Sequence, residues 1–134
     1  MSITTDEQLY HLLKKLNIPI NAIVFKDQLK TSKEGNYIIN MDDSTSSSNG
    51  SHWIALFIEN GKGYYFDSFG IIYPLEIKKN VPIKWYNKKD IQNYNSGFCG
   101  EYCIGYLYFM NKYKHLKPID RVKLYLDHFE DYNH

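Results

Sequence analysis

The residues best suited to covalent chemistry lie in the stretch QNYNSGFCGEYC, from Gln92 to Cys103. Cys99 stands where we expect the first turn of a helix to begin. A helix N-terminus offers unpaired backbone N–H groups and a partial positive charge, which favour the thiolate that attacks a carbonyl carbon. The stretch therefore indicates a candidate nucleophile. The alternative is a small buried apolar residue, the commoner role of a cysteine, and Cys103 fits that role on the inner face of the same helix.

Other residues of this stretch also suit acyl transfer. The side-chain amide of Gln92 and the backbone N–H of Cys99 could bind a developing oxyanion, and each such donor contributes roughly 3 kcal/mol to transition-state stabilisation. Gly97 and Gly100 permit a tight turn along which a substrate backbone can lie closely. Zinc is a weaker interpretation, because Cys99, Cys103 and one histidine are too few ligands at an unusual spacing. We expect neither a metal nor another cofactor.

A base for the cysteine has to come from elsewhere, and a predicted hairpin supplies one. Ser51–Glu59 is apolar on both faces and predicts a central strand, Asn60-Gly61 predicts a two-residue turn, and Tyr64–Phe69 predicts the return strand. Because side chains alternate along strands, His52 and Asp67 are then diagonal neighbours on one face, roughly 7–8 Å apart at the backbone. Either residue alone would more simply be a strand-end residue. Together, they allow a carboxylate to orient one imidazole nitrogen and leave the other free.

The remaining elements must position this group. We expect helices over Thr5–Leu16, Cys99–Tyr113 and Asp120–Phe129, and further strands over Asn36–Met41 and Ile83–Tyr86. Ile20–Phe25 suits either a short strand or a docked loop. Asp42–Gly50 (DDSTSSSNG) is a polar loop directly before His52, and it is either plain surface or a lid beside the site.

Length and charge narrow the class of protein. A chain of 134 residues predicts one compact domain, residues 1–134, and a net charge of +1 gives no general argument for nucleic-acid or membrane binding. A local basic cluster suits either a solvated face or a nucleic-acid contact, and it comprises Lys78, Lys79, Lys84, Lys88 and Lys89. The chain shows no apolar run of transmembrane length and no signal-peptide core, and its two cysteines are poorly spaced for a disulfide. We therefore expect a reducing compartment.

The order of these motifs resembles a known family. His-Trp in SHW (Ser51–Trp53), Asp in YYFDSFG (Tyr64–Gly70), and Gln followed by Cys-Gly in QNYNSGFCGEYC are similar to the adenovirus protease (adenain) and the related SUMO-specific proteases. The N-terminal helix and NYIINMD also fit the order of the adenovirus branch. The resemblance implies an α+β, papain-related fold. Such a fold has a central, mostly antiparallel sheet with flanking helices, and the catalytic cysteine begins a helix packed on that sheet.

The resemblance also implies a role for each matching residue. Cys99 is the nucleophile, His52 the general base, Asp67 the acid that orients the histidine, and Gln92 the oxyanion donor. Substrate contacts are expected at Trp53, Gly97 and Gly100. Trp53 matches the aromatic residue beside the imidazole, although a plain core tryptophan would look the same. This chain is shorter than the adenovirus enzyme and lacks the cysteine through which a peptide activates that enzyme, so we do not expect disulfide activation.

By the same resemblance, we expect a monomeric thiol endopeptidase of a DNA virus or a virophage-like element. It would cleave capsid or other virion precursors, at sites that contain glycine, in the virion and the host-cell cytoplasm. Two alternatives stay open. One is a ubiquitin- or SUMO-like deconjugating protease, although so short a chain has little surface to grip a folded modifier. The other is a non-catalytic binding module on the same fold, with the lysine cluster contacting nucleic acid.

Overall fold

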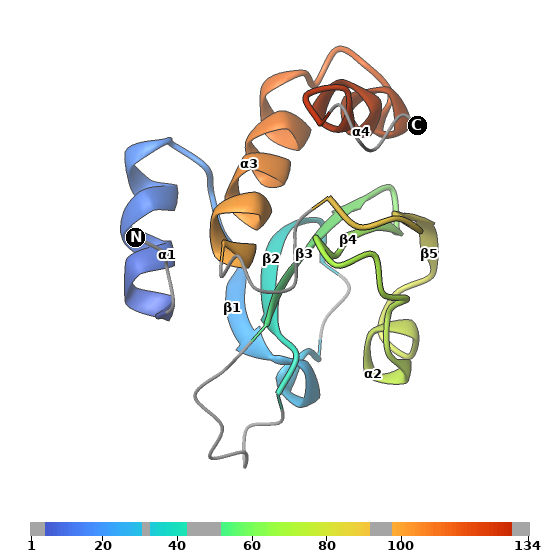
Figure 1. Ribbon diagram of the computed structural model, residues 1–134. Coiled ribbons are helices and arrows are strands. Elements are labelled where there is room, and N and C mark those ends of the chain that lie inside the picture. The colour runs from blue at the N-terminus through green and yellow to red at the C-terminus, as the bar shows by residue number, and fades with distance from the viewer. Residues whose placement is uncertain (1–4, 31–32, 43–51, 92–97, 130–134) are drawn as a thin grey trace.

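The computed structural model describes residues 5–30, 33–42, 52–91 and 98–129 (Figure 1). It is an α+β structure in which a mixed five-stranded sheet is flanked by helices. In chain order the elements are α1 (Asp6–Lys15), β1 (Ala22–Phe25), the 3-10 turn η1 (Lys26–Gln28), β2 (Gly35–Asn40), β3 (Trp53–Glu59), β4 (Lys62–Phe66), α2 (Leu75–Lys78), β5 (Ile83–Tyr86), α3 (Cys99–Lys112) and α4 (Pro118–Leu126).

The sheet is antiparallel only at its centre. Its strand order, β1-β2-β3-β4-β5, follows the sequence, and β2, β3 and β4 pair antiparallel. The two outer strands run parallel to their neighbours, β1 beside β2 and β5 beside β4. The prediction of a mostly antiparallel sheet therefore holds for the central strands alone. The ambiguous segment Ile20–Phe25 forms the outer strand β1 over Ala22–Phe25.

The hairpin between β3 and β4 has the predicted two-residue turn. Glu59 faces Lys62, and the two residues between them, Asn60 and Gly61, have φ angles of 53° and 73°. Positive φ at both positions is what a type I′ turn requires, and Asn-Gly adopts it readily. Both strands are shorter than expected, since β3 begins at Trp53 and β4 ends at Phe66. His52 and Asp67 therefore lie just past the ends of the paired strands.

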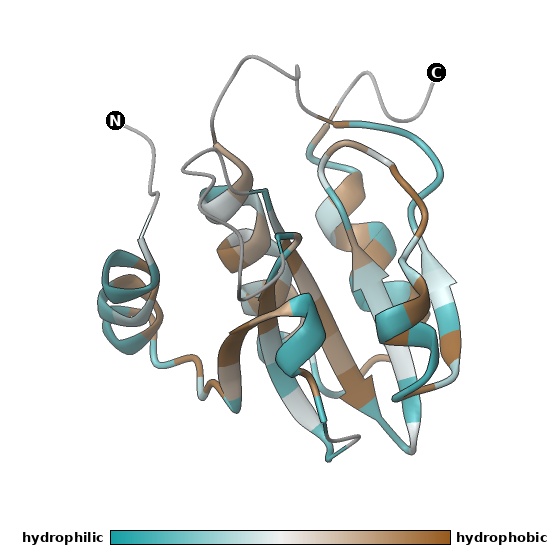
Figure 2. Ribbon diagram, turned by 90° about the horizontal axis from the view of Figure 1, so that it is seen from below, coloured by the Kyte–Doolittle hydropathy of each residue, from teal (hydrophilic) through white to brown (hydrophobic). Residues whose placement is uncertain are grey.

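Apolar side chains fill both faces of the sheet. Trp53, Ala55 and Phe57 of β3 belong to the core cluster that includes the inner faces of α1, α3 and α4, whereas the alternate β3 residues pack with Ile77 of α2 on the opposite face. Burial on both sides explains why β3 is apolar throughout its length. The hydropathy colouring of Figure 2 shows how the apolar residues gather on the sheet and on the helix faces turned toward it.

Helix α3 carries the candidate nucleophile into this core. Its buried residues Cys103, Leu107 and Met110 recur at helical spacing and form the face that packs on the sheet. Arg121 of α4 lies near the C-terminal end of α3. Its buried side chain pairs with Glu59 at 3.1 Å and donates to backbone carbonyls that follow α3. This interaction ties the end of α3 to the β3–β4 hairpin. Within the described residues, no helix is both long and apolar enough to span a bilayer.

Candidate active site

The predicted histidine and aspartate are in contact. His52 Nε2 lies 2.6 Å from Asp67 Oδ1, and Asp67 is only 2% exposed. The same carboxylate oxygen accepts a hydrogen bond of 2.8 Å from the backbone N–H of Phe69, which fixes its orientation. The pair meets because the Asn-Gly turn sets the register of the hairpin that leads out to both residues.

Asn87 fixes the backbone of the aspartate, and the sequence analysis did not single it out. Its Oδ1 accepts from the Asp67 N–H at 2.9 Å, and its Nδ2 donates to the carbonyl oxygens of Asp67 and Lys89. The side-chain amide thus pairs with Asp67 as the backbone of a neighbouring strand would. Asn87 is 1% exposed, so these bonds are shielded from water. Nothing in the sequence distinguishes this asparagine from the many others of the chain.

The aromatic ring that packs on the imidazole belongs to Phe69. Its ring centroid lies 4.0 Å from that of His52, and the two planes are 9° apart. Trp53, which the resemblance places beside the imidazole, instead contributes its backbone to the site and buries its indole in the core on the α3 side. Strand alternation accounts for this difference, because adjacent residues point to opposite faces.

Cys99 is the first residue of α3 and is 8% exposed. Its sulfur accepts a hydrogen bond of 3.5 Å from the backbone N–H of Trp53, the residue next to His52. An N–H donor and a helix N-terminus both stabilise negative charge on the sulfur. Gly100 is the second residue of α3 and is buried, so it continues the helix, and its expected contact with a substrate stays a prediction.

Cys103 contacts the backbone carbonyl of Trp53. The described β3–β4 ladder ends at the pair of Ala55 and Phe66, so Trp53 lies beyond it. Cys103 Sγ lies 3.3 Å from the Trp53 carbonyl oxygen, and burial raises the pKa of the Cys103 thiol well above its ordinary value. The thiol therefore stays protonated and donates to the carbonyl. The two cysteines of α3 thus engage the N–H and the C=O of one residue.

The charge state of His52 suits a thiolate–imidazolium pair. Burial lowers the pKa of His52, but the hydrogen bond with Asp67, the interaction with the nearby Cys99 sulfur and the negative charges of both groups raise it by more, to about 9 from 6.5. At neutral pH the imidazole is therefore protonated. Nε2 faces Asp67, and the buried Nδ1 has no hydrogen-bond partner of normal geometry within the described segments. Nδ1 is the nitrogen left for the sulfur of Cys99.

Other predicted residues contribute less to this picture. Gln92, Gly97 and the loop Asp42–Gly50, apart from Asp42, lie outside the described residues. In the predicted basic cluster, Lys78 ends α2 and Lys79 follows it, Lys84 lies on β5, and Lys88 and Lys89 follow β5. All of them but half-buried Lys89 are exposed. Lys84 and Lys88 flank Trp85 and Tyr86 in a shallow hollow. Among the residues that the structure describes, no group of three or more His, Cys, Asp or Glu side chains could hold a metal ion.

No known protein-family model matches the chain, and no curated protein sequence is significantly similar to it.

Proposed function

We propose that this chain is a cysteine endopeptidase in which Cys99 is the nucleophile. The observation that carries the proposal is the grouping of Asp67, His52 and Cys99. The Asp67 carboxylate lies 2.6 Å from one nitrogen of His52. The sulfur of Cys99, at the start of α3, accepts a hydrogen bond from the backbone N–H of Trp53, the residue next to His52. A nucleophile beside a base that a third group orients is the arrangement used for covalent catalysis of acyl transfer.

In the acylation half of the reaction, the Cys99 thiolate attacks the scissile carbonyl carbon. The S–C bond forms as the carbonyl π electrons move onto oxygen. The backbone N–H of Cys99 and the side-chain amide of Gln92 bind that oxyanion. When the intermediate collapses, the C–N bond breaks and the His52 imidazolium gives its proton to the departing amine.

In the deacylation half, His52 is neutral and acts as the base that the resemblance assigns to it. It takes a proton from a water molecule, whose oxygen attacks the thioester carbonyl. Collapse of this second intermediate releases the carboxylic acid and restores the thiolate–imidazolium pair. Asp67 keeps the imidazole in one orientation and stabilises its charged form throughout.

The substrate proposal comes from the sequence resemblance to the adenovirus protease. We propose that the enzyme cleaves capsid or other virion precursors at glycine-containing sites, and that its fold is the papain-related fold of that family. The central antiparallel strands and the cysteine at the start of a sheet-packed helix support this assignment. The two outer strands run parallel to their neighbours, and the segment directly after β5 supplies Asn87, which holds the backbone of Asp67.

The direct test incubates the purified protein with the capsid precursor of its own virus and sequences the new N-termini. Wild type should give discrete fragments, and Cys99→Ala should give none. Identical patterns from both proteins would refute the maturation role. Turnover of a Gly-Gly-linked ubiquitin or SUMO fluorogenic substrate, without cleavage of the precursor, would indicate a deconjugating protease instead.

A further inference from the structure

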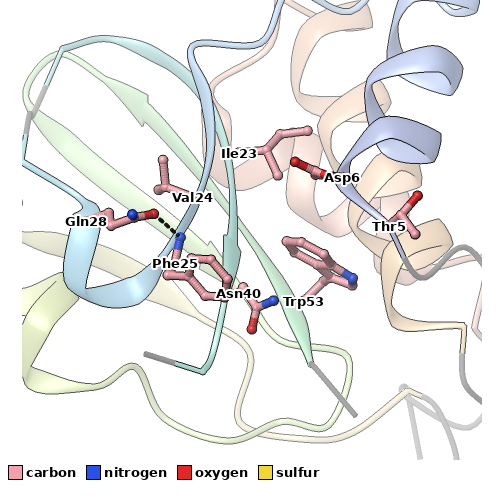
Figure 3. A pocket seen from close by; sticks show the side chains of 8 residues that line it. All are labelled: Thr5, Asp6, Ile23, Val24, Phe25, Gln28, Asn40 and Trp53. Carbon is pink, nitrogen blue, oxygen red and sulfur yellow. Dashed lines mark hydrogen bonds between the residues drawn. The ribbon is translucent and has the colours of Figure 1, made fainter. Parts of the chain in front are cut away.

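A second hollow borders the candidate active site at Trp53. A cavity of about 380 Å³ lies between the first turn of α1 and the neighbouring ends of β1, β2 and β3 (Figure 3). Ligand pockets in proteins measure roughly 300–1,000 Å³, so this one is at the small end of the range. Its size leaves room for an amino-acid side chain of a bound peptide.

Trp53 connects this cavity to the nucleophile. Its backbone N–H donates to Cys99 Sγ, and its indole forms one wall of the cavity. The indole Nε1–H is buried and has no hydrogen-bond partner within the described parts of the chain. Buried polar groups are almost always paired in native proteins, so this donor calls for an acceptor that the described residues do not supply. A carbonyl oxygen of a bound peptide would supply that acceptor.

The lining of the cavity selects by charge. Its apolar walls are Ile23, Val24, Phe25 and the Trp53 indole, and among the described residues that line it Asp6 alone is ionisable. Figure 3 shows the Asp6 carboxylate turned toward Ile23. The first cation after β1, Lys26, is engaged elsewhere, 3.7 Å from Glu76. Aliphatic and aromatic walls with one carboxylate suit a long apolar stem that ends in a positive charge.

We propose that this cavity is a specificity subsite for a lysine or arginine side chain of the substrate peptide. The stem packs on Ile23 and the Trp53 indole, the cationic head pairs with Asp6, and a peptide carbonyl accepts from Trp53 Nε1–H. This subsite rests on the proposed peptidase function, but peptide binding can be measured without catalysis. An acidic side chain would be repelled, and an uncharged aliphatic one would lose the ion pair.

The test uses Cys99→Ala protein and short capped peptides. The chain has two tryptophans, so its ¹H–¹⁵N spectrum holds two indole N–H resonances, and Trp85→Phe assigns that of Trp53. Titration with acetyl-Gly-Gly-Lys-Gly-Gly-amide should shift the Trp53 resonance. The same peptide with norleucine should bind more weakly, and the peptide with glutamate should bind least.

Two variants separate the carboxylate from general effects at the start of α1. Asp6 is exposed, so Asp6→Asn should weaken binding of the lysine peptide about threefold to fivefold, the upper end of the effect of one exposed ion pair, and should leave binding of the norleucine peptide unchanged. Glu7→Gln removes the neighbouring charge from the same helical turn, but Glu7 does not line the cavity. This variant should bind the lysine peptide and the norleucine peptide as tightly as its parent does.

Equal affinity for lysine and norleucine peptides, an Asp6→Asn variant that binds like its parent, or a Trp53 resonance that no peptide moves would each overturn the subsite. None of these results bears on whether Cys99 is a nucleophile. Conversely, an unreactive Cys99 in the wild-type protein would refute the peptidase function, whatever binds in the cavity.

Discussion

At the scale of single residues, the imidazole of His52 determines the state of the site. With a pKa of about 9, it is protonated under neutral conditions and stands ready to give a proton to a leaving amine. Asp67 has two roles here, since its carboxylate both stabilises that charge and orients the ring. The stack of Phe69 on the other side restricts the ring to the same plane. The charge therefore depends more on Asp67 than on any other neighbour.

Asp67→Asn should lower the pKa of His52 below about 9, because burial continues to disfavour the charged ring while the carboxylate no longer compensates. The alkaline limb of the pH–rate profile should move to lower pH, and the rate at neutral pH should fall about 100-fold. NMR titration of the His52 Cε1–H resonance measures the first effect and peptide hydrolysis the second. An unchanged titration would show that Asp67 does not set the charge.

Cys103 acts through the backbone of Trp53. Cys103→Ala removes the donor to the Trp53 carbonyl and should cost about 1 kcal/mol of unfolding free energy, together with a lower kcat. Cys103→Ser keeps a hydroxyl donor and should retain more of the kcat than alanine does. The comparison requires urea unfolding and peptide hydrolysis on both variants. If serine and alanine have the same kcat, the hydrogen bond does not position the nucleophile.

At the scale of elements, the site depends on where strands stop rather than on where they run. His52 directly precedes β3, Asp67 directly follows β4, and Asn87 directly follows β5. Asn87 then joins the end of β4 to the segment after β5, and Ile91 N–H adds a second bond of 2.9 Å to the Ser68 carbonyl. These bonds join the segment that carries Asp67 to the segment that follows β5.

Asn87→Ala should therefore be costly. It removes three hydrogen bonds of a buried side chain and leaves backbone groups of Asp67 unpaired, so we expect a loss of about 2–3 kcal/mol in unfolding free energy. It should also lower the pKa of His52, because Asp67 is no longer held in place. Asn80→Ala is the matched control, since Asn80 makes a single side-chain bond to Glu76 on α2, away from the site. Equal losses in both variants would refute the positioning role.

Part of this arrangement was predictable from local signals. Asn60-Gly61 specifies a type I′ turn, and that turn alone determines which residues of the two strands come together, so His52 and Asp67 could be paired in advance. The start of α3 at Cys99 followed from its apolar helical spacing. By contrast, the contacts of Phe69 and Asn87 depend on how chain ends turn beyond the strands, and no periodic pattern records that. The parallel pairing of β1 and β5 is a long-range choice, also invisible in short apolar runs.

At the scale of the whole molecule, the raised pKa of His52 makes stability depend on pH. A group whose pKa is higher in the folded than in the unfolded state binds protons more tightly when folded, so its contribution is complete below pH 6.5 and is lost as the pH rises through about 9. The shift corresponds to about 3 kcal/mol. Urea unfolding of wild type and His52→Gln should show the difference between them shrinking by about this amount from pH 6 to pH 10. A constant difference would contradict the linkage.

The central claim is that Cys99 and His52 form a reactive pair, and iodoacetamide tests it without a substrate. Mass spectrometry after brief labelling at pH 6 should find Cys99 alkylated much faster than free cysteine and Cys103, which is fully buried, unmodified. His52→Ala should remove the advantage at Cys99. Labelling of Cys99 no faster than free cysteine, or equally fast in His52→Ala, would contradict the account and favour a non-catalytic binding module.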